Sequence, residues 1–159
     1  EDLEFVVKSE EIKIKGKNSK LFKEDIKMYS DGNIKVNNLN GNFSLKGLNS
    51  KLISETILIE AKNIDGSFSN NTDKNEITLL KVNDEDVSYV KNDDTDMYAK
   101  KINFNNETSI IELIDSVVII RNEEKITGDY GTLDTKNNSY KIKSNNETKV
   151  RVLIKNDEQ

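Results

Sequence analysis

Apolar and polar residues alternate along most of this sequence. A period of two places alternate side chains on opposite faces of a β-strand. The pattern therefore predicts an all-β chain in which each strand turns one face to a core and the other to water. Such runs lie at residues 12–14, 34–36, 43–45, 77–79, 102–104, 140–142 and 150–152.

Clusters of Asn, Asp and Gly separate the alternating runs. Asp and Asn side chains bond to nearby backbone groups and tolerate left-handed geometry, so these clusters predict turns. Residues 19–29 and 107–116 have apolar residues at mixed spacing, and there we allow one short helix at most. The turn clusters lie at residues 31–33, 40–42, 65–66, 70–73, 92–94 and 137–138.

The strand-and-turn pattern recurs in units of about 25–40 residues. Residues 86–105 align with residues 115–134, so that Val87 corresponds to Val117 and Tyr89 to Ile119. One such unit cannot bury its own apolar face, whereas stacked units form a continuous core. We expect a single β domain over residues 1–159, with the best-matched repeats in residues 86–154.

Composition favours a binding scaffold over an enzyme. The chain has no His and no Cys, which excludes the usual catalytic triads, thiol chemistry and most zinc sites. Its 29 acidic residues are spread evenly and single out no catalytic pair. We therefore expect no catalytic residue, no cofactor and no metal site.

Charge and hydropathy narrow the set of partners. The net charge is -5, so there is no cationic excess to neutralise phosphates, and a nucleic-acid partner is not expected. No apolar run approaches the ~18 residues of a membrane span. The sequence begins at Glu1 without Met, and we expect a signal or anchor segment to precede it.

Residues 110–152 carry the most specific pattern. The strand around Asp115-Ser116-Val117 is followed by Gly128-Asp129, then by residues 130–137 and two further strands. This order resembles the OstA-like repeat of the periplasmic lipopolysaccharide-transport proteins, the LptA/LptC group. The resemblance is good over residues 86–154 and diffuse over residues 1–85. Asp115-Ser116 stands where Gly-Asn is usual, and Asn137-Asn138 where Gly is common.

The resemblance implies a twisted, open β-jellyroll of stacked antiparallel strands. Its apolar interior shelters lipopolysaccharide acyl chains, and its ends join related Lpt β-jellyroll domains by pairing of strand edges. Copies of this chain are a further candidate partner. The implied location is the periplasm, for a soluble protein or one whose N-terminal inner-membrane anchor has been removed. LptA-like and LptC-like identities both stay open.

A lipid conduit needs an apolar lining without buried charge, and end strands whose edges can pair with another sheet. The candidates for the lining are Ile12, Ile14, Met28, Ile34, Val36, Ile57, Ile59, Ile102, Phe104, Val117, Ile119, Ile126, Tyr140 and Ile142. The candidates for the assembly edges are Phe5, Val6, Val7, Val150, Val152 and Ile154.

The same apolar face is also what any β-sheet needs to form a core. The alternative is a structural or adhesive β-repeat protein of the cell envelope with a closed, dry core. Its lining residues would contact only one another, and its terminal strands would pair within their own sheet.

Overall fold

The computed structural model describes residues 2–6, 10–69, 75–145 and 149–154. All the regular elements in these ranges are strands, as the alternating pattern predicts, and no helix capable of spanning a membrane is found there. The strands are β1 (Asp2–Val6), β2 (Glu11–Lys15), β3 (Ser19–Lys23), β4 (Ile26–Ser30), β5 (Asn33–Asn37), β6 (Asn42–Ile53), β7 (Ile57–Phe68), β8 (Ile77–Asn92), β9 (Thr95–Asn105), β10 (Ile110–Arg121), β11 (Glu124–Asp134), β12 (Ser139–Lys143) and β13 (Arg151–Ile154).

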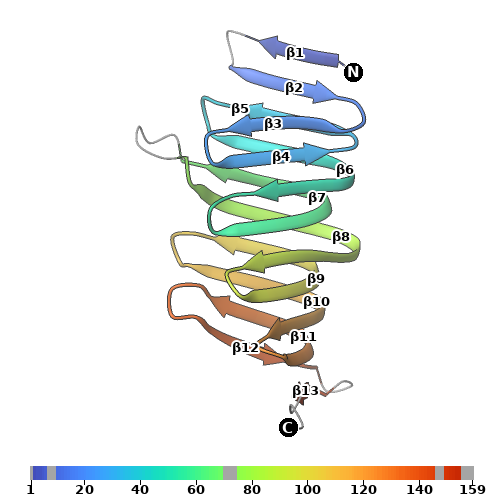
Figure 1. The fold of residues 1–159 in the computed structure, drawn as a ribbon, viewed down its shortest axis with the longest axis vertical. Helices are drawn as coiled ribbons and strands as arrows, with labels where there is room; N and C mark the ends of the chain where they lie inside the picture. Colours follow the sequence, from blue (N-terminus) through green and yellow to red (C-terminus); the bar gives the residue numbers. More distant parts are fainter. Residues whose placement is uncertain (1, 7–9, 70–74, 146–148, 155–159) are drawn as a thin grey trace.

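The strands form one antiparallel sheet, stacked along the long axis of the molecule with β1 at one end and β13 at the other (Figure 1). The two regions in which a short helix was allowed are strands: β3 and β4 in the first, and the start of β10 in the second. Neighbouring strands pair in both regions, and the ladder hydrogen bonds override the mixed apolar spacing.

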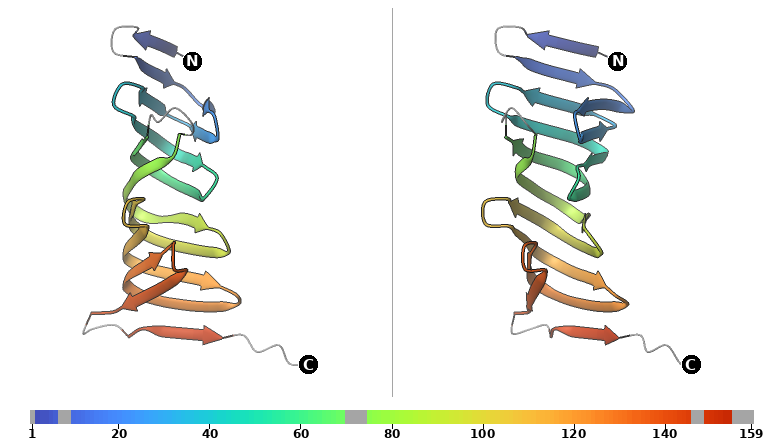
Figure 2. Two further views of the ribbon diagram at one scale, coloured as in Figure 1. Left: turned by 90° about the vertical axis from the view of Figure 1, so that its left-hand side faces the viewer. Right: turned by 60° about the vertical axis from the view of Figure 1, so that its left-hand side comes forward.

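The six long strands, β6 to β11, bend near their middle. Pairing shifts register between Lys46 and Ser50 on β6, and between Ile114 and Val117 on β10. Such a shift is a β-bulge, which bends a strand and increases its twist. Each long strand is thereby divided into two parts, and these parts belong to two walls that enclose a common interior (Figure 2).

Short strands complete the two walls at each end. β6 pairs with β5 through residues 42–46 and with β4 through residues 51–53. β11 pairs with β12 through residues 130–134 and with β13 through residues 124–127. The first wall therefore runs from β1, β2 and β5 to β12, and the second wall runs from β3 and β4 to β13.

At the N-terminal end of the stack, glycines allow the chain to pass from one wall to the other. The amide of Gly16, between β2 and β3, donates to the carbonyl of Gly32, between β4 and β5, at 2.9 Å. A Cβ added to Gly47 would lie 2.7 Å from both the Gly32 nitrogen and the Ser30 Oγ. Only a residue without a side chain fits where the β6 bend meets this corner.

The β10 bend explains one departure from the OstA-like pattern. Asp115 and Ser116 have φ angles of 65° and 58°. This is the left-handed region, which Gly and Asn enter most easily. Asp115-Ser116 thus adopts a backbone conformation that Gly-Asn would enter at lower cost.

Two expectations from the sequence are wrong in detail. Asp65-Gly66 is not a turn but lies within β7, where Gly66 is paired with Phe43 of β6. The repeat alignment is also displaced by one residue over β8, because Val87 is 48% exposed whereas Val117 is 1% exposed. The bulges of β8 and β10 differ in length, so that Val90, not Tyr89, corresponds to Ile119.

Candidate functional site

The interior between the two walls holds most of the expected lining residues. Ten of the fourteen are buried, and all of these except Ile126 belong to one continuous hydrophobic cluster. The middle of the interior is therefore filled by side chains from both walls. The ten are Met28, Ile34, Val36, Ile57, Ile59, Ile102, Phe104, Val117, Ile119 and Ile126.

The other four lining residues lie at the two ends of the first wall. Ile12 and Ile14 on β2, and Tyr140 and Ile142 on β12, are only partly buried. Of these, Ile14, Tyr140 and Ile142 pack against the central cluster. The apolar lining is thus continuous with the core and becomes accessible to solvent at both ends.

The N-terminal end has a larger apolar opening than the alternating pattern suggests. Leu3 and Phe5 on β1 pair with Ile14 and Ile12, so all four side chains project from the same face of the first wall. Leu3 is 72% exposed and Phe5 54% exposed. The reason is that β1 extends the first wall beyond β3, which is the outermost strand of the second wall at this end. Leu3 is not among the site residues expected from the sequence. It lies two residues before Phe5, however, and this spacing places both side chains on the same face of the strand.

The C-terminal end is lined from both walls. Val152 on β13 lies opposite the buried Ile126 and is 53% exposed. On β12, the hydroxyl of Tyr140 donates to Glu124 Oε2 at 3.2 Å. Burial of the ring, followed by this bond to a carboxylate, raises the pKa of Tyr140 above its ordinary value. The Tyr140 hydroxyl therefore stays protonated, and the side chain at the opening is uncharged.

The expected assembly edges lie on the outermost strands. In the part of the chain that the structure describes, β1 pairs only with β2, and β12 and β13 pair only with β11. Phe5 and Val6 belong to β1, and Val7 lies outside the described residues. Val152 and Ile154 belong to β13, while Val150 precedes it. These outer edges can accept a further strand.

One carboxylate of the described residues is buried, although a lipid conduit needs a lining without buried charge. Asp84, at the β8 bend, is only 7% exposed. It accepts bonds from the Lys62 amide at 2.7 Å, the Asn63 side-chain amide at 2.8 Å and the Ser88 hydroxyl at 3.0 Å. These donors compensate for burial of the charge. Sequence alone could not distinguish Asp84 from its acidic neighbours.

Comparison with known proteins places the fold. No family model and no curated protein matches the sequence. The structure is similar to the crystal structure of LptH, the LptA homologous periplasmic component of the lipopolysaccharide transport device from Pseudomonas aeruginosa. The TM-score is 0.67 at 12% sequence identity, over 82% of this chain and 95% of that chain. The chain has the LptA-type β-jellyroll fold, as the OstA-like resemblance implies.

Proposed function

We propose that this chain is a non-enzymatic, lipid-binding component of a periplasmic lipopolysaccharide-transport bridge. Residues 1–159 act as one OstA-like domain whose interior shelters acyl chains. The domain joins end to end with related β-jellyroll domains or with copies of itself. The observation that carries the proposal is an apolar interior, in an LptA-type fold, that opens at both ends beside β1, β12 and β13, each of which pairs with a single strand among the described residues.

Lipid contact begins at the two ends rather than in the middle. Leu3, Phe5, Ile12 and Ile14 offer apolar surface at one end, and Tyr140, Ile142 and Val152 do so at the other. Each methylene transferred from water to such a surface contributes about 0.8 kcal/mol. Several methylenes therefore suffice to hold an acyl chain at an opening. Deeper insertion requires the walls to separate, since the central side chains already contact one another.

Site-specific photo-crosslinking tests the lipid site. A photoreactive residue is placed at Ile142 or Ile14, and in matched controls at Lys141 or Lys13, which are their neighbours on the opposite face of the same strands. Each variant is irradiated with purified lipopolysaccharide. We expect adducts at Ile142 and Ile14 and not at the lysines. Adducts confined to the lysine positions, or absent from all four, would refute lipid binding in the interior.

A structural or adhesive envelope protein with a closed core is the second candidate. The complete burial of the middle of the interior favours it. In that case, the crosslinking experiment yields no lipid adducts at the inward positions. Stability is also unchanged by lipopolysaccharide, whereas a ligand that binds only the folded state raises the midpoint of thermal unfolding.

A further inference from the structure

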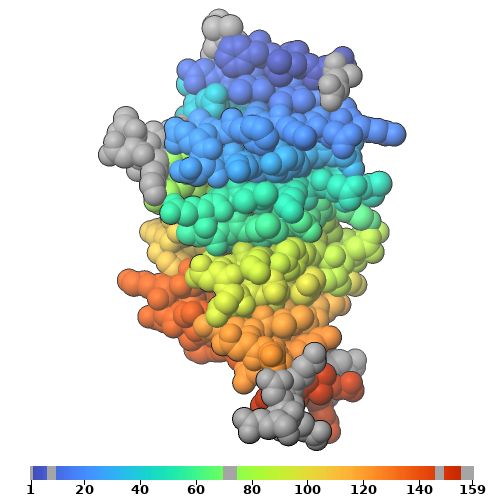
Figure 3. Space-filling model, viewed as in Figure 1, coloured from blue at the N-terminus to red at the C-terminus, as the bar shows by residue number. Residues whose placement is uncertain are grey.

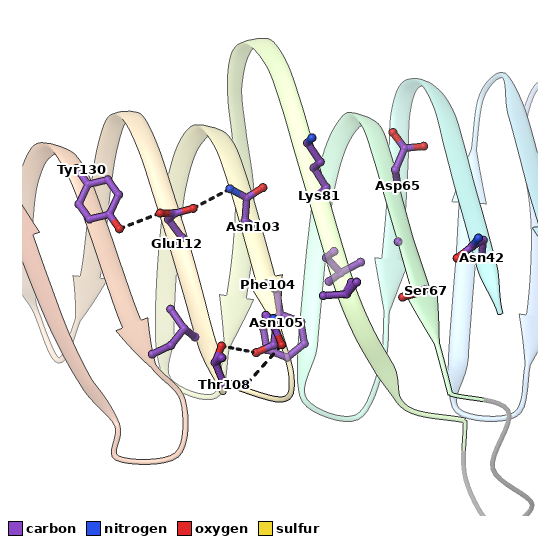
Figure 4. Close-up of a pocket in the computed structure, with 14 residues that line it drawn as sticks. Asn42, Asp65, Ser67, Lys81, Asn103, Phe104, Asn105, Thr108, Glu112 and Tyr130 are labelled. Carbon is purple, nitrogen blue, oxygen red and sulfur yellow. Dashed lines mark hydrogen bonds between the residues drawn. The ribbon is translucent and has the colours of Figure 1, made fainter. Parts of the chain in front are cut away.

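A second concave site lies on the outer face of the first wall, away from the apolar interior. Its volume is about 650 Å³, which is within the range of small-molecule sites. Outward-facing side chains of the long strands line it, among them Lys81, Asn103 and Glu112 (Figure 4). The lipid-transport proposal does not use this site.

Eight of the lining residues form two rows that cross the strands. Members of each row lie opposite one another on neighbouring strands, so the groove between the rows follows the long axis of the stack. The first row is polar and the second mixes polar with apolar side chains. The rows are Asp65, Lys81, Asn103 and Glu112, and Ser67, Leu79, Asn105 and Ile110.

Hydrogen bonds hold the acceptors of the first row in place. Asn103 Nδ2 donates to Glu112 Oε2, and the Tyr130 hydroxyl donates to Glu112 Oε1, both at 2.8 Å. The bond to the carboxylate raises the pKa of Tyr130, so this hydroxyl stays protonated. Because Asn103 uses its amino group, its Oδ1 is left as an acceptor, and each Glu112 oxygen can accept a further bond.

Donors lie beside these acceptors. Asn105 Oδ1 accepts the backbone amides of Glu107 and Thr108 at 2.9 and 3.4 Å, which leaves Asn105 Nδ2 as a donor. Within the described part of the chain, neither Asn105 Nδ2 nor Lys81 Nζ has a partner. The groove thus presents positioned donors and acceptors together.

The charges in the groove nearly cancel. Asp65 Oδ2 forms an ion pair with Lys46 Nζ at 2.7 Å. The other two charged side chains that line the groove, Glu112 and Lys81, have opposite charges that sum to zero. A phosphate or an acidic sugar would find no cationic excess here. Most of the surface that lines the groove is nevertheless apolar, and Leu79, which is 49% exposed, and Ile110, which is partly exposed, lie among the polar groups.

We propose that this outer groove binds a neutral saccharide. A sugar hydroxyl both donates and accepts hydrogen bonds, as this mixture of groups requires. The C–H face of a sugar ring matches the surface of Leu79 and Ile110. An acyl chain would instead cover Glu112, Asn103 and Lys81 without replacing their hydrogen bonds to water, which is costly.

A nuclear magnetic resonance titration tests the site on the whole chain. The isotopically labelled protein is mixed with maltohexaose, cellohexaose or chitohexaose at millimolar concentration. We expect at least one of these neutral glycans to shift the amide signals of residues 79–81, 103–105 and 110–112, with saturation. The absence of shifts with all three glycans would overturn the proposal, as would similar shifts caused by inorganic phosphate or decanoate.

A matched pair of variants assigns the binding to the groove. Glu112→Gln removes the charged acceptor and keeps the size of the side chain. Glu60→Gln makes the same change on the outer face of the second wall, where Glu60 contacts Lys51. We expect Glu112→Gln to weaken glycan binding by about tenfold, the usual effect of losing a hydrogen bond to a charged group, and Glu60→Gln to leave it unchanged. Equal affinity in all three proteins would refute the assignment.

Discussion

Asp84 and Asp86 lie two residues apart on β8 and differ in burial and in the interactions that they form. Asp84 is buried at the bend and is held by three hydrogen bonds from β7 and β8. Asp86 is exposed and forms an ion pair with the Lys62 side chain, whose hydrogen bond lowers the pKa of Asp86. Position relative to the bulge, rather than residue type, decides which carboxylate stabilises the fold.

Replacing Asp84 tests this difference. Asp84→Ala leaves the Lys62 amide and the Asn63 side chain without their acceptor, and we expect a loss of about 1–3 kcal/mol in the free energy of unfolding. Asp86→Ala removes only a solvent-screened ion pair and leaves stability nearly unchanged. Urea unfolding of both variants measures the two effects. Equal losses would show that Asp84 is not a structural acceptor.

Two leucines provide a second comparison. Leu113 on β10 is completely buried, whereas Leu48 at the β6 bend is 74% exposed. Leu113→Ala leaves a cavity between the walls and is expected to cost about 2–5 kcal/mol. Leu48→Ala is expected to change stability by no more than about 0.5 kcal/mol. Thermal or urea unfolding distinguishes them, and a small effect at Leu113 would mean that the interior is loosely packed.

At the scale of elements, the terminal strands differ from the long ones in how they are covered. The long strands are paired on both edges and carry most of the buried cluster. β1 is paired on one edge within the described residues, and its inward side chains Leu3 and Phe5 are exposed. An exposed apolar strand edge favours association with another sheet. If domains join end to end as proposed, the contact at the N-terminal end should therefore depend on β1.

Phe5→Lys tests the role of β1 in assembly. If the N-terminal end receives another domain, the lysine places a charge in that contact. Because burial of a Phe side chain contributes about 1.5–3 kcal/mol, we expect self-association to weaken by about tenfold or more. Sedimentation velocity over a range of protein concentrations measures this.

Phe22→Lys on β3 is the control for Phe5→Lys. Phe22 is 63% exposed and contacts Tyr29 edge-on with ring centroids 5.8 Å apart. It lies opposite Lys27, on the outer face of the second wall, and its replacement should leave association unchanged. An equal effect of the two substitutions would indicate general apolar adhesion instead of contact through β1.

At the scale of the whole molecule, the chain is a stack that runs along its long axis from the N-terminal to the C-terminal strands (Figure 3), except that β5, and not β3, adjoins β2. The main contacts join neighbouring strands, so stability is distributed as in a repeat protein. The central strands have a paired strand on each side. Among the described residues, the strands at the two ends have a paired strand on one side only.

Hydrogen exchange should show this gradient. We expect the slowest amide exchange in β8, β9 and β10, and the fastest among strand amides in β1 and β13, because local opening at an end disrupts few buried contacts. Mass spectrometry of exchanged, proteolysed protein measures the rates by segment. Uniform protection from β1 to β13 would contradict the stack description and indicate a single cooperative unit.

The sequence by itself determined the local features of this protein. Alternation identified the strands and the inward face, since the period of side chains along a strand is a local property. Thus Ile34, Ile59 and Ile119 were expected inside and are buried. The sequence likewise shows that the chain has no imidazole and no thiol side chain, whatever its fold.

Only the tertiary structure decided the features that depend on pairing between distant residues. The positions and lengths of the bulges left Asp84 buried beside its hydrogen-bond donors and Val87 exposed, and displaced the repeat alignment by one residue. Contact between the walls closed the middle of the interior and left its ends open. The outer groove depends on the register that aligns Lys81 with Asn103 and Glu112. Register and wall contact are set by packing of the whole sheet, which a local pattern does not encode.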